Sequence, residues 1–170
     1  MTVAAIQSLR ILMLTAFATL LTACQSLPAP TGLSAEQVAV LKDEGFVETA
    51  LGWELSMPER LLFATNESVL PATQGERLRQ VAARLVSVGI TTARIEGHTD
   101  STGSAAYNLT LSQARAEAVS TPMRAGGMQF APDQIVGRGE TLPLSSNDTP
   151  EGRQDNRRVV VIVTPMPASQ

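Results

Sequence analysis

The chain has 170 residues, which is enough for one domain or for a small domain with an appendage. Hydrophobic residues make up 44% of it and aromatic residues only 4%, so Leu, Val, Ile and Ala must form most of a packed core. The net charge of −3 gives no support to electrostatic binding of nucleic acid, and the single cysteine excludes an internal disulfide or a zinc site built around it.

Residues 1–23 are predicted to be a lipoprotein signal peptide. Arg10 supplies a weak positive charge, and residues 11–20 form an apolar run that is too short to span a bilayer. The run ends in LTAC, where small residues and Cys24 resemble a bacterial lipobox. An ordinary signal peptide or a short buried helix is the alternative. We therefore expect lipid on Cys24, and Gln25 after it, in place of Asp, favours the outer membrane.

The mature chain is expected to begin with a lipidated tether and a short helix. Residues 24–33 contain two prolines and show no periodicity. Ser34 and Gln37 have the spacing of a capping box, and Gly45 ends the helix that follows. Because a short helix is marginal alone, it must dock on its own domain or on a partner.

The next segment, residues 46–63, is predicted to form short strands that are broken at Gly52 and Pro58. Trp53 is either a core residue or a partner contact, since tryptophan is enriched at binding hot spots. We treat residues 34–56 as a helix and strand segment that is a candidate for binding a partner.

Residues 73–88 give the clearest helical pattern in the chain. One apolar face follows the spacing i, i+3, i+4 and i+7, and it consists of Leu78, Val81, Ala82 and Leu85. Gly89 ends this helix. A period of two over residues 92–99 then predicts a strand, with Asp100 at its end.

A second helix is predicted to open at Ser112 and to end at Gly126, with Pro122 kinking or shortening it. Residues 134–138 are predicted to form a strand, residues 139–151 a polar loop, and residues 158–164 an apolar, central strand. The tail, residues 166–170, is expected to be loose. Alternating helices and strands imply a sandwich with helices on one face of a sheet.

Three ordered motifs resemble the OmpA-like C-terminal domain family. They are IEGHTDSTG from residue 95, YN with LSQARA between residues 107 and 116, and NDTPEGR with NRRV between residues 147 and 159. The resemblance covers residues 61–164. It implies an α+β fold over residues 57–165, a two-layer βαβαβ sandwich with a mixed sheet, preceded by the short N-terminal helix and strands. It also implies noncovalent binding to the diaminopimelate of peptidoglycan stem peptides.

The segment before this domain, GLSAEQVAVLKDEGF followed by GWEL, resembles the YfiB-type outer-membrane lipoproteins. That resemblance implies capture of a periplasmic YfiR-type repressor, which releases an inner-membrane diguanylate cyclase and raises cyclic di-GMP. The alternative is a structural tether of the peptidoglycan-associated lipoprotein type without signalling. The sequence leaves open whether the protein forms a homodimer. Five residues are candidates for the repressor contact, with packing on their own domain as the alternative: Leu33, Val38, Leu41, Phe46 and Trp53.

Asp100 and Arg115 are the candidate ligand clamp. Diaminopimelate presents an ammonium and a carboxylate on one carbon, so Asp100 can accept from the ammonium and Arg115 can bind the carboxylate bidentately. Both residues match the family's ligand-binding pair. A direct salt bridge between Asp100 and Arg115 is the structural alternative, which a ligand would replace or bridge.

Further pocket residues follow from the same resemblance, with loop structure or helix capping as the alternative for several of them. They are Thr65, Asn66, Thr102, Gly103, Tyr107, Asn108, Leu111, Asn156 and Arg157.

His98 invites a catalytic or metal-binding interpretation, which the residues around it do not support. The sequence offers no recognisable arrangement of a nucleophile with this histidine. A single imidazole with Glu96 and Asp100 on a short strand gives poor metal geometry. We therefore expect a binding protein without catalytic residues, metal or cofactor, and reject a wall hydrolase.

Overall fold

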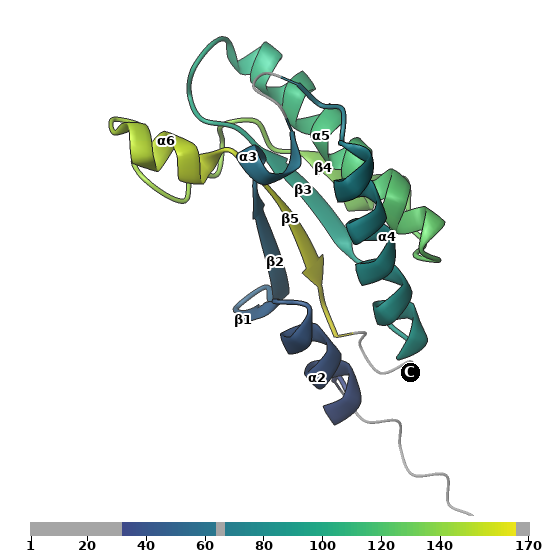
Figure 1. Ribbon diagram of the computed structural model, residues 1–170. Helices are drawn as coiled ribbons and strands as arrows, with labels where there is room; N and C mark the ends of the chain where they lie inside the picture. The colour runs from purple at the N-terminus through teal and green to yellow at the C-terminus, as the bar shows by residue number, and fades with distance from the viewer. Residues whose placement is uncertain (1–31, 64–66, 166–170) are drawn as a thin grey trace, which may run out of the picture. The chain divides into compact units, whose positions relative to one another are not determined.

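The computed structural model describes residues 32–63 and 67–165 (Figure 1). The expected signal peptide, the lipidation site at Cys24 and the tail 166–170 lie outside the described residues. So do Thr65 and Asn66, two of the predicted pocket residues.

A mixed five-stranded sheet forms the centre of the fold, in the order β1-β2-β5-β3-β4. All neighbouring strands are antiparallel except β3 and β4, which are parallel. The strands are β1 (Val47–Thr49), β2 (Gly52–Pro58), β3 (Arg94–His98), β4 (Ile135–Gly137) and β5 (Arg158–Val163). The apolar strand β5 is central, as its sequence predicts, because neighbours on both edges remove it from water.

Two long helices, α4 (Ala72–Ser87) and α5 (Ala105–Ala125), pack against each other on one face of the sheet (Figure 1). The predicted apolar face of α4 is buried in full and joins the core. Helix α5 lies over β3 and β4. The α+β two-layer architecture is thereby confirmed.

The predicted start of the second helix is wrong. Helix α5 begins at Ala105 rather than at Ser112, and the Ser104 hydroxyl caps it by accepting from the Tyr107 backbone N–H at 3.2 Å. The first turns carry exposed side chains such as Tyr107 and Leu109, so no apolar period marks them. This places Arg115 in the third turn of the helix rather than at its start.

Of the two effects predicted for Pro122, a kink or a shortened helix, the structure excludes shortening, because α5 continues through Pro122 to Ala125. Proline removes only its own N–H donor, and the next turn still closes with a 3.0 Å bond from the Gly126 N–H to the Pro122 carbonyl. The helix then ends at the two glycines, as predicted.

Two short helices were not predicted. Helix α6 (Pro150–Asn156) begins in the last two residues of the expected polar loop and continues beyond it, with Thr149 as its N-cap and Pro150 in its first turn. Helix α3 (Glu59–Leu62) follows β2 directly. Both lie at the end of the sheet where β3 finishes (Figure 1).

The N-terminal helix α2 (Ala35–Asp43) docks on the domain's own helix α4. Its predicted capping box between Ser34 and Gln37 is present. The Gln37 amide donates to the Val88 carbonyl at 3.1 Å, and Arg84 pairs with Asp43 at 2.7 Å. Because β2 also pairs with β5, the N-terminal segment is part of the same packed sandwich.

The structure corrects the partner-contact prediction for Leu41, Phe46 and Trp53. Their side chains belong to the hydrophobic core and are 0%, 3% and 6% exposed. A partner cannot reach them without opening the domain, so their role is packing. Leu33 and Val38 are partly buried against the same core.

Candidate functional site

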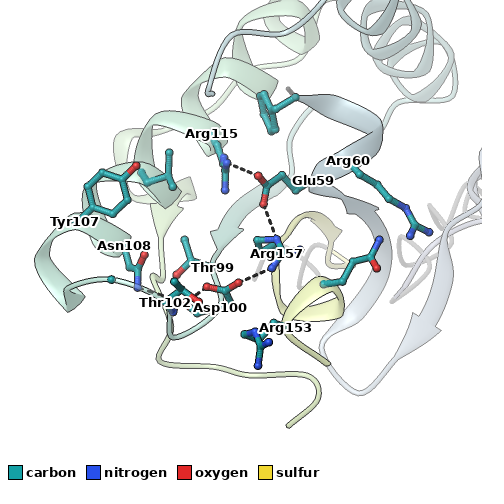
Figure 2. Close-up of a pocket in the computed structure, with 14 residues that line it drawn as sticks. Glu59, Arg60, Thr99, Asp100, Thr102, Tyr107, Asn108, Arg115, Arg153 and Arg157 are labelled. Carbon is teal, nitrogen blue, oxygen red and sulfur yellow. Dashed lines mark hydrogen bonds and ion pairs between the residues drawn. The ribbon is translucent and has the colours of Figure 1, made fainter. Parts of the chain in front are cut away.

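A pocket of about 500 Å³ opens at the end of the sheet where β3 finishes, between α3, α5 and α6. Its walls come from four separate parts of the chain (Figure 2). Eight of the predicted site residues line it: Asp100, Thr102, Gly103, Tyr107, Asn108, Leu111, Arg115 and Arg157. The fold therefore gathers most of the predicted site residues into one cavity.

A chain of ion pairs crosses the floor of this pocket. Arg115 Nη2 contacts Glu59 Oε1 at 2.6 Å, Glu59 Oε2 contacts Arg157 Nε at 3.2 Å, and Arg157 Nη1 donates to Asp100 Oδ2 at 2.5 Å (Figure 2). The direct salt bridge between Asp100 and Arg115, which the sequence left open, is therefore not formed. Glu59 and Arg157 lie between the two halves of the predicted clamp.

Asp100 is ionised and well held. It follows the last residue of β3, and its Oδ1 accepts from the Thr102 backbone N–H at 2.9 Å. Burial raises the pKa of Asp100, but the hydrogen bonds from Thr102 and Arg157 outweigh this and keep the pKa below its usual value. At neutral pH this site therefore presents a fixed negative charge.

Arg115 is the largest fully buried side chain of the described residues, with 2% exposed. Besides its contact with Glu59, its Nε donates to the Glu67 carbonyl at 3.2 Å, and its guanidinium lies 5.5 Å from the centroid of the Phe63 ring. Arg157 is more accessible, with 36% of its side chain exposed. Arg157 therefore lies nearer the surface of the pocket and Arg115 lies deeper.

Asn108 and Asn156 have structural partners. Asn108 Nδ2 donates to the Asp100 carbonyl at 3.2 Å and to Glu140 at 2.6 Å, which fixes the loop between β3 and α5. Asn156 is 0% exposed and does not line the pocket, which corrects its assignment as a pocket residue. Its Oδ1 accepts from the Leu144 and Ser145 N–H groups, so it holds the loop before α6.

Glu59 is the acidic residue of this pocket that the sequence did not predict. It lies outside all three motifs, directly after Pro58 in a segment predicted as strand. Its carboxylate is shared by two arginines, one from α5 and one that ends α6. No local pattern announces such a role, because the pairing depends on how three distant elements meet.

His98 does not line the pocket, although it belongs to the same motif as Asp100. It is 3% exposed, and burial, reinforced by the positive charge of Arg158, lowers the pKa of His98 to about 4. The imidazole is therefore neutral at pH 7. Within residues 32–63 and 67–165, no group of acidic, histidine and cysteine side chains has the arrangement of a metal site. No helix in those ranges is long and apolar enough to cross a membrane.

Comparison with known proteins relates this fold and pocket to a family. The model described as the OmpA family matches residues 62–157, more than half of the chain. The outer-membrane lipoprotein YfiB of Pseudomonas aeruginosa is 43% identical over 84% of this chain and 85% of its own length. The lipoprotein YfiB of Escherichia coli K12 is 41% identical over 85% of this chain and 90% of its own length.

Two solved structures share the architecture. The cell wall anchor of the T6SS from Pseudomonas aeruginosa has a TM-score of 0.58 at 25% identity, covering 81% of this chain and 100% of that one. The peptidoglycan-associated lipoprotein from Burkholderia pseudomallei has a TM-score of 0.51 at 28% identity, covering 63% and 87%. The family match and the two YfiB relatives show that this chain belongs to the OmpA family and, within it, to the YfiB-type outer-membrane lipoproteins.

Proposed function

We propose that this lipoprotein is anchored in the outer membrane through lipid on Cys24, binds peptidoglycan noncovalently and captures a YfiR-type repressor in the periplasm. Capture would release an inner-membrane diguanylate cyclase and raise cyclic di-GMP. The observation that carries the wall-binding part is an ionised Asp100 that pairs with Arg157 in one open pocket, with Arg115 linked to Arg157 through Glu59. The names of the two solved relatives, a cell wall anchor and a peptidoglycan-associated lipoprotein, support it.

The charges of the pocket match the free end of diaminopimelate. Its ammonium would donate hydrogen bonds to the Asp100 carboxylate, and its carboxylate would lie against Arg157 and Arg115. Guanidinium groups bind carboxylates through paired, charge-assisted hydrogen bonds, which supplies both affinity and orientation. The arrangement provides for binding without a chemical step, so we expect no turnover of wall peptide or glycan.

Asp100→Asn is expected to weaken binding to purified peptidoglycan by at least about tenfold, because it removes the charge that meets the ligand ammonium while keeping the side-chain volume. The measurement is co-sedimentation of the soluble protein with peptidoglycan sacculi. This variant is a sharper test than Arg115→Ala, since Arg115 is buried and its loss would disturb the fold.

The matched control is Asp133→Asn. Asp133 is exposed and precedes β4, at the opposite end of the parallel β3–β4 pair from Asp100. The Asp133→Asn variant should sediment with sacculi as the unmodified protein does. Both variants should have the circular dichroism spectrum of the unmodified protein. Normal sedimentation of Asp100→Asn would mean that the pocket is misassigned.

Because Leu41, Phe46 and Trp53 are buried, we propose that the repressor binds instead to the exposed surface of the β1–β2 hairpin. Val47 on β1 and Leu51 in the following turn are 66% and 67% exposed, between the two stretches whose sequences resemble the YfiB-type proteins. Two large apolar side chains on one exposed hairpin are suited to a protein contact.

We expect the soluble chain to retain a purified YfiR-type repressor in a pull-down, and the double change Val47→Ser and Leu51→Ser to weaken retention by about tenfold. Leu144→Ser is the control, because Leu144 is equally exposed but lies in the loop before α6. If the unmodified protein retains no repressor but still binds sacculi, the protein is a structural tether. The structural similarity to the peptidoglycan-associated lipoprotein makes such a tether the alternative function.

A further inference from the structure

His98 is a buried histidine on the face of the sheet opposite to α5. It is the last residue of β3, in which the preceding Gly97 faces the Ser112 carbonyl of α5. Its Nδ1 is buried and has no hydrogen-bond partner among the described residues. Its Nε2 lies 3.7 Å from Glu96 Oε2, beyond hydrogen-bond length. Within the described part of the chain, Glu96 has the only carboxylate within 4 Å of the ring.

Three arginines and two glutamates lie on the same face of the sheet as His98. They are Arg94 and Glu96 of β3, Arg138 directly after β4, Arg158 of β5 and Glu54 of β2. Arg158 is the cross-strand neighbour of His98. Glu96 Oε1 is already 2.5 Å from Arg138 Nη2 and 3.7 Å from Arg94 Nη1. A proton on His98 would therefore add a fourth cation beside one carboxylate that two of the arginines already share.

Opening of the structure around His98 must consequently depend on pH. In the closed structure, burial and the charge of Arg158 lower the pKa of His98 from its usual 6.5 to about 4, and Glu96 opposes this only in part. In an open form, in which water reaches the ring, the pKa returns toward 6.5. Between pH 6.5 and pH 4 the open form thus binds a proton that the closed form does not, so acid favours opening.

The segment that follows β4, residues 138–142, is fastened to the end of β3 beside His98. Two backbone hydrogen bonds join them. The Arg138 N–H donates to the Gly97 carbonyl at 2.8 Å, and the Thr99 N–H donates to the Gly139 carbonyl at 2.9 Å. The two bonds lie on either side of His98 in the sequence of β3, so the segment cannot leave this edge without exposing the end of the strand.

Side chains of the charged cluster also hold this segment. Arg138 is bound to Glu96, and Arg158 Nη2 donates to the Leu142 carbonyl at 3.3 Å. A protonated His98 would attract Glu96 and repel both arginines, because all three cations share the same buried surroundings. The proton would therefore weaken the contacts at both ends of residues 138–142.

We propose that His98 is an acid-sensitive switch, which releases residues 138–142 from the end of β3 when its ring gains a proton in an acidified periplasm. The switch lies outside the pocket at Asp100 and does not depend on the proposed wall binding. Release also separates Glu140 from Asn108, which donates to it at 2.6 Å. Acid thereby removes one support of the loop between β3 and α5.

Hydrogen exchange followed by NMR, on the mature chain with Cys24→Ser to prevent lipidation, measures the release. The Thr99 and Arg138 amides report it, because their hydrogen bonds join the segment to β3. With pKa values of 6.5 in the open form and about 4 in the closed form, the ratio of open to closed molecules should rise about fiftyfold between pH 7 and pH 4.5. At pH 4.5 these two amides should be less protected than the amides of the central strand β5, which report unfolding of the whole domain.

Three variants make the test specific. His98→Asn cannot titrate and should lose most of the rise in opening. Arg158→Gln keeps the histidine but removes the largest charge repulsion on it, so the rise should fall well below that of the unmodified protein. Arg77→Gln changes the net charge equally from an exposed position on α4 and should keep the full rise.

His98 is the only histidine of the chain, so the ring signals of a protein without a tag follow its titration directly. They should give a midpoint near pH 4, and a higher one in Arg158→Gln, which tests the switch even if His98→Asn does not fold. A midpoint near 6.5 in the folded protein would overturn the proposal. So would a full rise in His98→Asn, which would assign the acid response to carboxylates. Equal protection of the two reporter amides and of the β5 amides at pH 4.5 would show unfolding of the whole domain and refute a local release.

Discussion

Glu59→Ala is expected to lower the free energy of unfolding by about 3–5 kcal/mol, the cost of leaving a buried charge without its partner. The Glu59 side chain is 11% exposed and contacts Arg115, whose side chain is 2% exposed. When Glu59 is removed, Arg157 still pairs with Asp100. Arg115 has no other carboxylate among its described contacts, so its charge stays buried without a partner. Urea denaturation, with a comparison of midpoints at constant slope, measures the change.

Two variants make this test specific. Glu59→Gln keeps the volume and one acceptor oxygen, so it should lose less stability than Glu59→Ala. Glu76→Ala also removes a carboxylate from an arginine, Arg79, but that pair is about half exposed and should matter little. If Glu59→Ala unfolds at the same urea concentration as the unmodified protein, the ion-pair chain does not stabilise the fold.

Gly97→Ala is expected to destabilise the protein by about 3 kcal/mol or more, at the upper end of overpacking costs. Gly97 lies in β3 beneath α5, and a Cβ atom there would overlap the backbone carbonyl of Ser112. The clash is with backbone rather than with a flexible side chain, so relief requires α5 to move off the sheet. Thermal unfolding should show a midpoint lower by roughly 10 °C.

Gly75→Ala is the matched control for Gly97→Ala. Gly75 lies in α4, and a Cβ atom there meets nothing within 4 Å. Alanine should stabilise this helix by about 0.5–1 kcal/mol because glycine loses more backbone entropy on folding. A Gly97→Ala protein as stable as the unmodified one would contradict the close packing of α5 on β3. The pocket between α3, α5 and α6 depends on that packing, because the packing places Arg115 beside Glu59.

Local chemistry was sufficient to predict several elements from the sequence. The hydroxyl of Ser34 and the amide of Gln37 satisfy backbone groups within one turn, so their spacing alone defines the start of α2. The apolar period of α4 and the unbroken apolar run of β5 report burial directly. Asp100 was placed correctly at the end of β3, because a strand of period two can be followed residue by residue.

Other features were decided only by the tertiary structure. The first turns of α5 lack an apolar period, and Pro122 is accommodated in a helix that is packed on α4 and the sheet. Trp53 could have faced a partner or the core, and only the folded structure shows that it packs in the core, on a strand that pairs with β5.

The same division applies to the candidate site. The motifs identified Asp100, Arg115 and Arg157 as site residues, but not which carboxylate each arginine meets. Glu59, outside every motif, separates the predicted pair and binds both arginines. The sequence by itself identified three of the charged groups in the pocket, Asp100, Arg115 and Arg157, because motif residues and strand ends are local properties. Their pairing was decided by the meeting of α3, α5 and the end of α6, since ion pairs depend on distances that only the folded chain sets.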